Sequence, residues 1–141
     1  MKLDITLLSD AITSLQESIG TVSNEPWFNA QPKPVQNTLI AGVIQNFEFV
    51  YEHSIKMLRR RIEMDAATPT EADFSNFRDL LRTAAERGLI ADMEAWLGYR
   101  KMRNLTSHTY DHEKAREVYQ GTVQFMDDAK SLLQTLVARN V

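Results

Sequence analysis

Apolar residues recur every three or four positions along most of the chain, which is the spacing of one face of an α-helix. These stripes predict helices over residues 3–22, 35–65, 74–87, 92–106 and 112–138. Short polar or proline-containing segments separate them. Five amphipathic helices with short connections predict an all-α protein, folded as an up-and-down bundle of four or five helices.

Between the apolar stripes lie residues of the types that commonly begin or end a helix. Asp4 and Asp111 each precede a stripe and can cap its first turn, and Gly88 follows the third stripe, where a glycine commonly ends a helix. Residues 23–34 are predicted to be a loop, because three prolines there cannot continue the first helix. These are Pro26, Pro32 and Pro34.

Two large aromatic residues, Trp27 and Phe28, lie inside this proline-containing loop. Such residues in a loop are expected to bury their rings wherever apolar surface is available. We therefore expect them to form a hydrophobic plug on one end of the bundle. The alternative is that they contact a partner protein.

The helix over residues 35–65 has apolar positions on most of its circumference, so we expect it to lie at the centre of the bundle. Glu48 interrupts the stripe that runs from Ile40 to Ile62. A buried carboxylate is costly unless it is paired. The sequence thus predicts a contact between Glu48 and an arginine of another helix, Arg100 or Arg103. The alternative is that Glu48 reaches solvent at the edge of the stripe.

Length and composition indicate a single soluble globular domain over residues 1–141, with 43% hydrophobic and 25% charged residues. The chain has no cysteine, which excludes disulfides, thiolate zinc sites and cysteine nucleophiles. It has no apolar run long enough to span a membrane and no signal-peptide pattern, so a cytoplasmic location is expected. We expect no cofactor.

The formal net charge is −3, so the molecule as a whole is not a basic nucleic-acid binder and any anion-binding surface must be local. In an up-and-down bundle the second and fourth helices point the same way. Their basic C-terminal segments are then expected to share one end of the bundle. The residues concerned are Lys56, Arg59, Arg60, Arg61, Arg100, Lys101 and Arg103.

The segment Tyr99–Asp111 concentrates the groups most able to do chemistry. Arginine offers a planar charged fork for phosphate oxygens, and histidine can transfer a proton near neutral pH. On a continuous helix Arg103 and His108 would lie roughly 140° apart. The poor helix formers Thr106 and Ser107 predict that the helix ends there, so that His108 and Tyr110 can fold back toward Arg103.

The same segment offers groups for chemistry other than phosphate binding. His108 and His112 are four residues apart, near Asp111 and Glu113, but no third ligand has metal-like spacing, so no metal site is predicted. Thr106 and Ser107 lack the context of a catalytic triad and are interpreted as turn-forming or phosphate-bonding hydroxyls. The plainest alternative is that Arg103 complements the helix dipole and His108 only forms hydrogen bonds.

Arg103, Asn104, His108 and Tyr110 spell R-N-x-x-x-H-x-Y, which resembles the signature of the HEPN family, whose bacterial branch contains nucleotidyltransferase substrate-binding proteins. Residues 42–52 resemble the long second helix of that family. The segment 88–92, followed by Trp96-Leu97, resembles the entry to its motif helix. The likeness covers roughly residues 5 to 137. Ser54-Ile55 stands where many relatives carry an aromatic residue, which affects packing more than chemistry.

The resemblance implies a homodimer that pairs with a small nucleotidyltransferase and binds RNA or nucleotide phosphates. In toxin-type relatives of toxin–antitoxin pairs, the arginine and histidine matching Arg103 and His108 cut RNA without metal, and the tyrosine matching Tyr110 is adenylylated by the partner. The substrate- or phosphate-binding positions are expected to be Asn104, Arg100, Ser107 and Glu48. Two alternatives remain, which are a non-catalytic substrate- or nucleotide-binding subunit and a purely structural helical interaction module.

Overall fold

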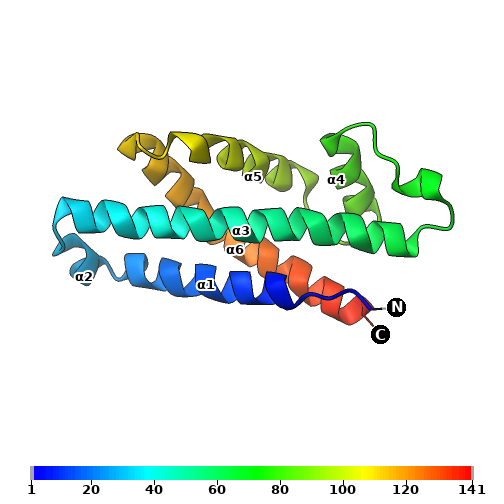
Figure 1. The fold of residues 1–141 in the computed structure, drawn as a ribbon, viewed down its shortest axis with the longest axis horizontal. Helices are drawn as coiled ribbons and strands as arrows, with labels where there is room; N and C mark the ends of the chain where they lie inside the picture. Colours follow the sequence, from blue (N-terminus) through cyan, green and yellow to red (C-terminus); the bar gives the residue numbers. More distant parts are fainter. Residues whose placement is uncertain (1, 141) are drawn as a thin grey trace.

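The computed structural model of the chain describes residues 2–140, and its ribbon is drawn in Figure 1. In chain order the helices are α1 (Thr6–Ser23), α2 (Glu25–Asn29), α3 (Lys33–Asp65), α4 (Phe77–Glu86), α5 (Met93–Leu105) and α6 (His112–Arg139), with 3₁₀ turns η1 (Pro69–Ala72) and η2 (Thr106–His108). Over these described residues there is no strand. The expected all-α helical bundle is confirmed.

The long helix α3 forms the centre of the molecule. In Figure 1, α1 runs alongside one flank of α3, α5 runs along the other, α4 is steeply inclined to α3 near the C-terminal end of α3, and α6 crosses α3 diagonally. The two chain ends meet, because the Leu3 backbone N–H donates to Asn140 Oδ1 and Asn140 Nδ2 donates to the Leu3 carbonyl, both at 2.8 Å. In the part of the chain that the structure describes, no helix is both long and apolar enough to cross a membrane.

An aromatic cluster joins α3, α5 and α6 in the core. The ring centre of Phe125 lies 4.8 Å from that of Phe47, 4.9 Å from that of Tyr99 and 5.8 Å from that of Trp96, each in an edge-to-face arrangement. Such pairs are favourable beyond their buried area. The Tyr99 hydroxyl donates to the Asp128 carboxylate. Burial and this bond to an anion raise the pKa of Tyr99, so it stays protonated.

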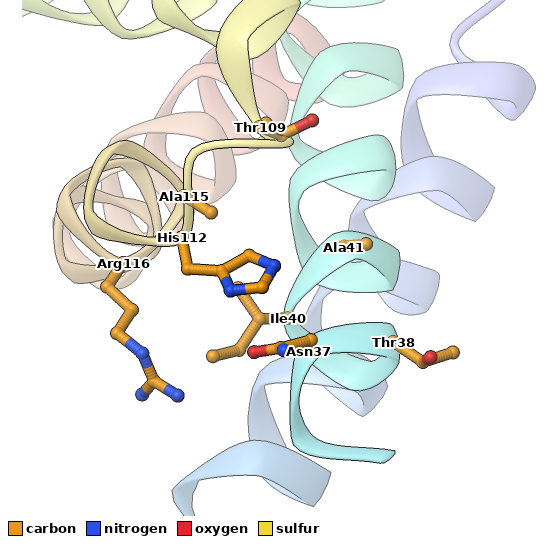
Figure 2. Close-up of a pocket in the computed structure, with 8 residues that line it drawn as sticks. All are labelled: Asn37, Thr38, Ile40, Ala41, Thr109, His112, Ala115 and Arg116. Atoms are coloured by element: carbon orange, nitrogen blue, oxygen red, sulfur yellow. The ribbon is translucent and has the colours of Figure 1, made fainter. Parts of the chain in front are cut away.

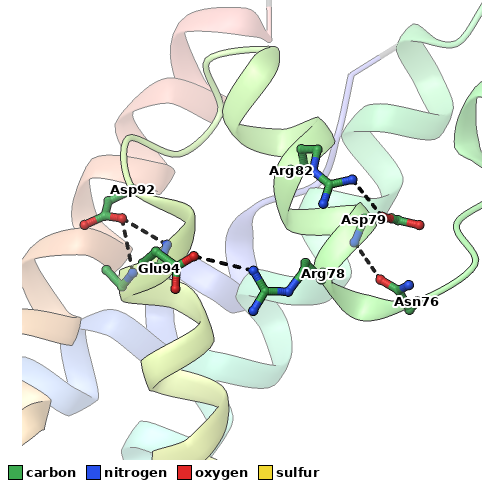
Figure 3. A network of polar contacts seen from close by, with 7 residues as sticks. Asn76, Arg78, Asp79, Arg82, Asp92 and Glu94 are labelled. Atoms are coloured by element: carbon green, nitrogen blue, oxygen red, sulfur yellow. Dashed lines mark hydrogen bonds and ion pairs between the residues drawn. The ribbon is translucent and has the colours of Figure 1, made fainter.

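Side-chain caps fix where α4, α5 and α6 begin. Asp92 Oδ1 accepts from the backbone N–H groups of Glu94 and Ala95, and Asn76 Oδ1 accepts from that of Asp79, as Figure 3 shows. At the start of α6, Asp111 Oδ1 accepts from the N–H of Glu113 at 3.0 Å. Each cap satisfies backbone donors that have no partner within the helix. The caps at Asp92 and Asp111 therefore hold both ends of the segment that carries the motif.

Three boundaries differ from the sequence predictions. The first helix begins at Thr6 and not at residue 3, and its N-cap position is Ile5 and not Asp4, although Asp4 Oδ1 accepts from the Thr6 N–H at 3.0 Å. Residues 23–34 are not wholly a loop, because Pro26 is accommodated in the first turn of the short helix α2. The helix predicted from residue 74 begins only at Phe77, after the Asn76 cap. Of the two aromatic residues in the segment 23–34, Phe28 is buried in the core while Trp27 is 42% exposed. Only Phe28 therefore acts as the expected plug.

The predicted shared basic end is wrong, because α3 and α5 run in opposite directions (Figure 1). Arg103 of α5 contacts Glu52 in the middle of α3, and the start of α6 lies beside the start of α3. The short helix α4 lies beside the C-terminal end of α3. It forms part of the connection between α3 and α5 and does not carry the chain back along the bundle. Arg60 and Arg61 therefore lie far along α3 from the motif.

We expect opposite effects from adding a methyl group at two glycines. Gly88, after α4, has φ +74°, and a Cβ there would lie 3.1 Å from Arg139 Nη2. Gly88→Ala should therefore destabilise the fold by about 1–2 kcal/mol. Gly42 is inside α3 with nothing within 4 Å of an added Cβ, so Gly42→Ala should stabilise by about 0.5–1 kcal/mol. Urea denaturation measures both, and equal effects would contradict this account.

Candidate functional site

The guanidinium of Arg103 is held from two sides. Its Nη2 donates to Glu52 Oε1 at 2.9 Å, its Nη1 donates to Thr106 Oγ1 at 3.1 Å, and Nη1 lies 3.8 Å from Glu48 Oε2. The predicted contact between Glu48 and Arg103 is confirmed, although Glu48 is partly exposed and not buried. The side chain of Arg103 is 34% exposed. Ion pairs at this exposure add little stability, so their main effect is to orient the guanidinium.

Glu52 is a contact that the sequence analysis missed. It lies one helical turn after Glu48 on α3, and residues four apart share one helix face. Once Glu48 was expected to meet Arg103, this spacing could have identified Glu52 as well. Of the two carboxylates, Glu52 lies closer to the Arg103 guanidinium, at 2.9 Å compared with 3.8 Å for Glu48.

The end of α5 is made by two hydroxyls that bond to their own helix. Thr106 Oγ1 donates to the Arg103 carbonyl at 2.6 Å, and Ser107 Oγ donates to the Asn104 carbonyl at 3.2 Å. Side chains that bond to nearby backbone carbonyls compete with the regular helix ladder. The chain tightens into η2 after Leu105, which confirms the predicted helix end.

His108 and Tyr110 form a second, exposed group. Their ring centres are 6.1 Å apart in an edge-to-face arrangement, and Tyr110 is 80% exposed. No hydrogen bond within residues 2–140 joins His108 to Arg103. Asn104 and Ser107, which lie between Arg103 and His108 in the sequence, are exposed. In a single chain, the predicted site residues therefore form two neighbouring groups, one around Arg103 and one around His108.

Arg100 lies one helical turn before Arg103 and stacks on the ring of Phe77 from α4, with its Cζ 4.4 Å from the ring centre. Burial raises the pKa of the Tyr51 hydroxyl, while the positive charges of Arg100, Arg103 and Arg59 oppose that shift. The guanidinium groups of Arg100, Arg103 and Arg59 therefore all lie close enough to the Tyr51 hydroxyl of α3 to affect its pKa. The positive charge near the motif lies along the seam between α3 and α5, and not on one end of the bundle.

The region around His108 and His112 offers no built metal site. Among the residues that the structure describes, no three histidine, aspartate or glutamate side chains come together as a metal-binding group. Asp111, which lies between the two histidines, uses its carboxylate to cap α6.

A hollow of about 240 Å³ opens between α3 and α6 (Figure 2). It lies beside the turn between α5 and α6 that carries His108 and Tyr110, which we call the motif turn. We call the hollow itself the α3–α6 hollow. Thr109, which separates His108 from Tyr110, is one of its lining residues. The others are Asn37, Thr38, Ile40, Ala41, His112, Ala115 and Arg116. The sequence analysis did not single out Asn37 or Arg116, because nothing in the spacing within either helix connects them.

Residues 3–138 match the protein family described as "Nucleotidyltransferase substrate binding protein like". The chain is 47% identical over 139 residues to a Haemophilus influenzae protein named "Probable ribonuclease HepT", covering 99% of this chain and 95% of that protein. These similarities confirm the resemblance found from the motif.

Two solved structures share the fold. One, from Haemophilus influenzae, is described as the fold of a substrate binding domain of a nucleotidyltransferase; it is 46% identical, with a TM-score of 0.90, covering 94% of this chain and 98% of that one. The other, from Thermus thermophilus, is 24% identical with a TM-score of 0.70, covering 92% and 98% of the two chains. The second likeness concerns the fold alone.

Proposed function

This chain belongs to the nucleotidyltransferase substrate binding protein like family, and from that premise we propose that it is a metal-independent ribonuclease, the HEPN subunit of a toxin–antitoxin pair with a small nucleotidyltransferase. The observation that carries the proposal is an oriented Arg103 in the last turn of α5, followed by an exposed His108 in the turn η2. The 47% identity to a protein named as a probable ribonuclease supports it. Its site of action is the cytoplasm.

In the proposed reaction the ribose 2′-oxygen attacks the adjacent phosphorus and expels the 5′-oxygen. His108 accepts the proton of the 2′-hydroxyl or gives a proton to the leaving 5′-oxygen. Arg103 stabilises the negative charge that develops on the phosphorane oxygens. A guanidinium has five N–H donors, and hydrogen bonds to Glu52 and Thr106 occupy only two of them. Arg103 can therefore bind a phosphate while these residues hold it in place.

The separation of the Arg103 and His108 groups fits a site completed by a second copy of the chain. A homodimer with two facing motifs would place the RNA phosphate between them. Asn104 and Ser107 are exposed on the same segment and would contribute hydrogen bonds to the phosphate. Arg100 would add positive charge from the preceding turn.

The test of the proposal is to incubate the purified protein with RNA in the presence of a chelator. Cleavage is expected, because none of the proposed steps uses a metal. Intact RNA at high protein concentration would contradict the ribonuclease proposal. It would favour the second candidate, a non-catalytic subunit that binds the substrate of the nucleotidyltransferase. The description of the structure from Haemophilus influenzae as the fold of a substrate binding domain of a nucleotidyltransferase supports this candidate.

Tyr110 is the proposed modification site. It is 80% exposed, so a partner enzyme can reach its hydroxyl. The tyrosine oxygen would attack the α-phosphorus of ATP and release pyrophosphate, which leaves AMP on Tyr110. The added phosphate would repel RNA beside His108.

With the partner nucleotidyltransferase and ATP, we expect the intact mass to rise by one or more AMP units. Tyr110→Phe should abolish the increase, because it removes only the attacking oxygen. The control is Tyr119→Phe, at a half-buried tyrosine of α6, which should be modified as the wild type is. An unchanged increase in the Tyr110→Phe variant would show that the modification lies elsewhere.

A further inference from the structure

The α3–α6 hollow has an apolar floor and polar walls. Ile40 and Ala115 are buried beneath it, while Asn37 and Arg116 are half-buried at its sides. Figure 2 shows the His112 ring, the Asn37 amide and the Arg116 side chain gathered in the gap between α6 and α3. Its volume of about 240 Å³ lies just below the range of about 300–1,000 Å³ that is usual for small-molecule sites. This space suits one small ring-bearing group and is too small for a folded peptide.

The polar groups at the hollow have unused hydrogen-bonding capacity. Within residues 2–140, no side-chain hydrogen bond or ion pair involves Asn37, His112 or Arg116, whereas Arg103 and Arg61 are both paired with carboxylates. Their donors include the planar fork of an arginine, which matches phosphate oxygens. No carboxylate lines this hollow. The local charge therefore favours an anion over a cation.

The hollow continues toward α2. A second hollow, of about 320 Å³, shares Ile40 and Arg116 with the first and also includes Glu25 and Tyr119. The two hollows therefore adjoin at Ile40 and Arg116. Glu25 in the second hollow would repel phosphate, so Arg116 is placed to bind a phosphate at the boundary between the two hollows.

We infer that the α3–α6 hollow binds one nucleotide unit of the RNA strand, next to the phosphate that is cut. The base lies on Ile40 and Ala115, the Asn37 amide bonds to the edge of the base, and Arg116 binds the phosphate of that unit. An amide carries both donors and an acceptor, which is what reading a base edge requires. This inference deepens the proposed ribonuclease function and rests on it, since the hollow adjoins the motif through Thr109.

The binding test uses nuclear magnetic resonance on the full chain, with the four nucleoside 5′-monophosphates and short single-stranded RNA as separate probes. We expect shifts of the Asn37 side-chain amide and the His112 ring with at least one probe. Arg116→Gln should weaken that binding about tenfold, the effect of losing one charged hydrogen bond. Arg60→Gln, at an exposed arginine of α3, is the matched control and should bind as the wild type does.

Asn37→Ala should change which base is preferred, whereas Gln45→Ala, at an exposed amide of the same helix, should not. If RNA shifts these signals but free monophosphates do not, the hollow binds a nucleotide unit of an RNA strand. If only the monophosphates shift them, the hollow binds free nucleotides, and its assignment to the RNA strand is overturned. The inference is also overturned if neither probe shifts Asn37 or His112 at millimolar concentration.

Cleavage is measured separately, so the two proposals can fail independently. If RNA is cut but these signals never move, the ribonuclease stands and the subsite fails. If the signals move as expected but RNA stays intact, the hollow still binds a nucleotide unit, but the ribonuclease proposal fails and so does the placement of that unit next to a cut phosphate. For an active enzyme, Arg116→Gln should raise KM while kcat changes little, because Arg116 lies outside the group that performs the chemistry.

Discussion

Replacing His108 by alanine is expected to reduce RNA cleavage by about 10²–10⁴-fold, the usual contribution of a general acid or base. The imidazole is the side chain in the motif turn that is best suited to act as a general acid or base. It is exposed, so its removal should leave no cavity and should change the free energy of unfolding by less than about 0.5 kcal/mol. Single-turnover cleavage of a labelled RNA measures the rate, and urea denaturation measures the stability.

The matched control for this variant is His53→Ala, at a half-buried histidine of α3. It removes an imidazole of the same size from outside the motif turn. We expect it to retain most of the wild-type cleavage rate. If both histidine variants cut RNA as fast as the wild type, the activity does not depend on His108, and contamination by another nuclease would have to be tested first.

The helices were predictable because their stripes and caps are local. An apolar residue every third or fourth position decides the buried face, as at Leu8, Ile12 and Leu15 of α1. The capping carboxylates of Asp92 and Asp111 bond to N–H groups only two or three residues away. Such contacts depend on neighbouring residues alone, so the sequence contains what is needed to predict them.

The direction of α5 was not predictable in the same way. The up-and-down assumption requires each helix to cross the bundle, but α4 has only ten residues and stays beside the end of α3. Its stripe of apolar residues is as clear as that of a longer helix, so the stripe alone does not reveal the difference. Because α4 does not reverse the chain along the bundle, α5 runs opposite to the predicted direction. The basic residues of α3 and α5 were therefore predicted at the same end of the bundle by mistake.

The candidate site was predictable where a motif or a charged residue in a stripe identified it. Glu48 was recognised because it interrupts an apolar stripe, and the pairing with Arg103 followed from the cost of burying a carboxylate. The α3–α6 hollow carries no such signal. Asn37 and Arg116 are 79 positions apart, as the difference of their residue numbers, and they come together only because α6 starts beside the start of α3.

Phe125→Ala is expected to destabilise the protein by about 3–5 kcal/mol, the range for deleting a buried phenyl ring. Phe125 is fully buried, and its ring contacts Phe47 from α3 and Trp96 and Tyr99 from α5. Alanine would leave a cavity at the point where three helices meet. Chemical denaturation followed by circular dichroism gives the change in the free energy of unfolding.

The matched control is Phe49→Ala on α3, at a ring that is 48% exposed. It should cost less than about 1 kcal/mol, because much of that ring is already in water. The comparison also tests how the motif is supported, since the Phe125 ring of α6 packs on Tyr99, one turn before Arg103. If α5 depends on this contact for its position, Phe125→Ala should lower cleavage even at temperatures where the variant is fully folded. Cleavage at the wild-type rate in the folded variant would mean that the ion pairs of Arg103 and the Asp92 cap suffice to hold the motif helix in place.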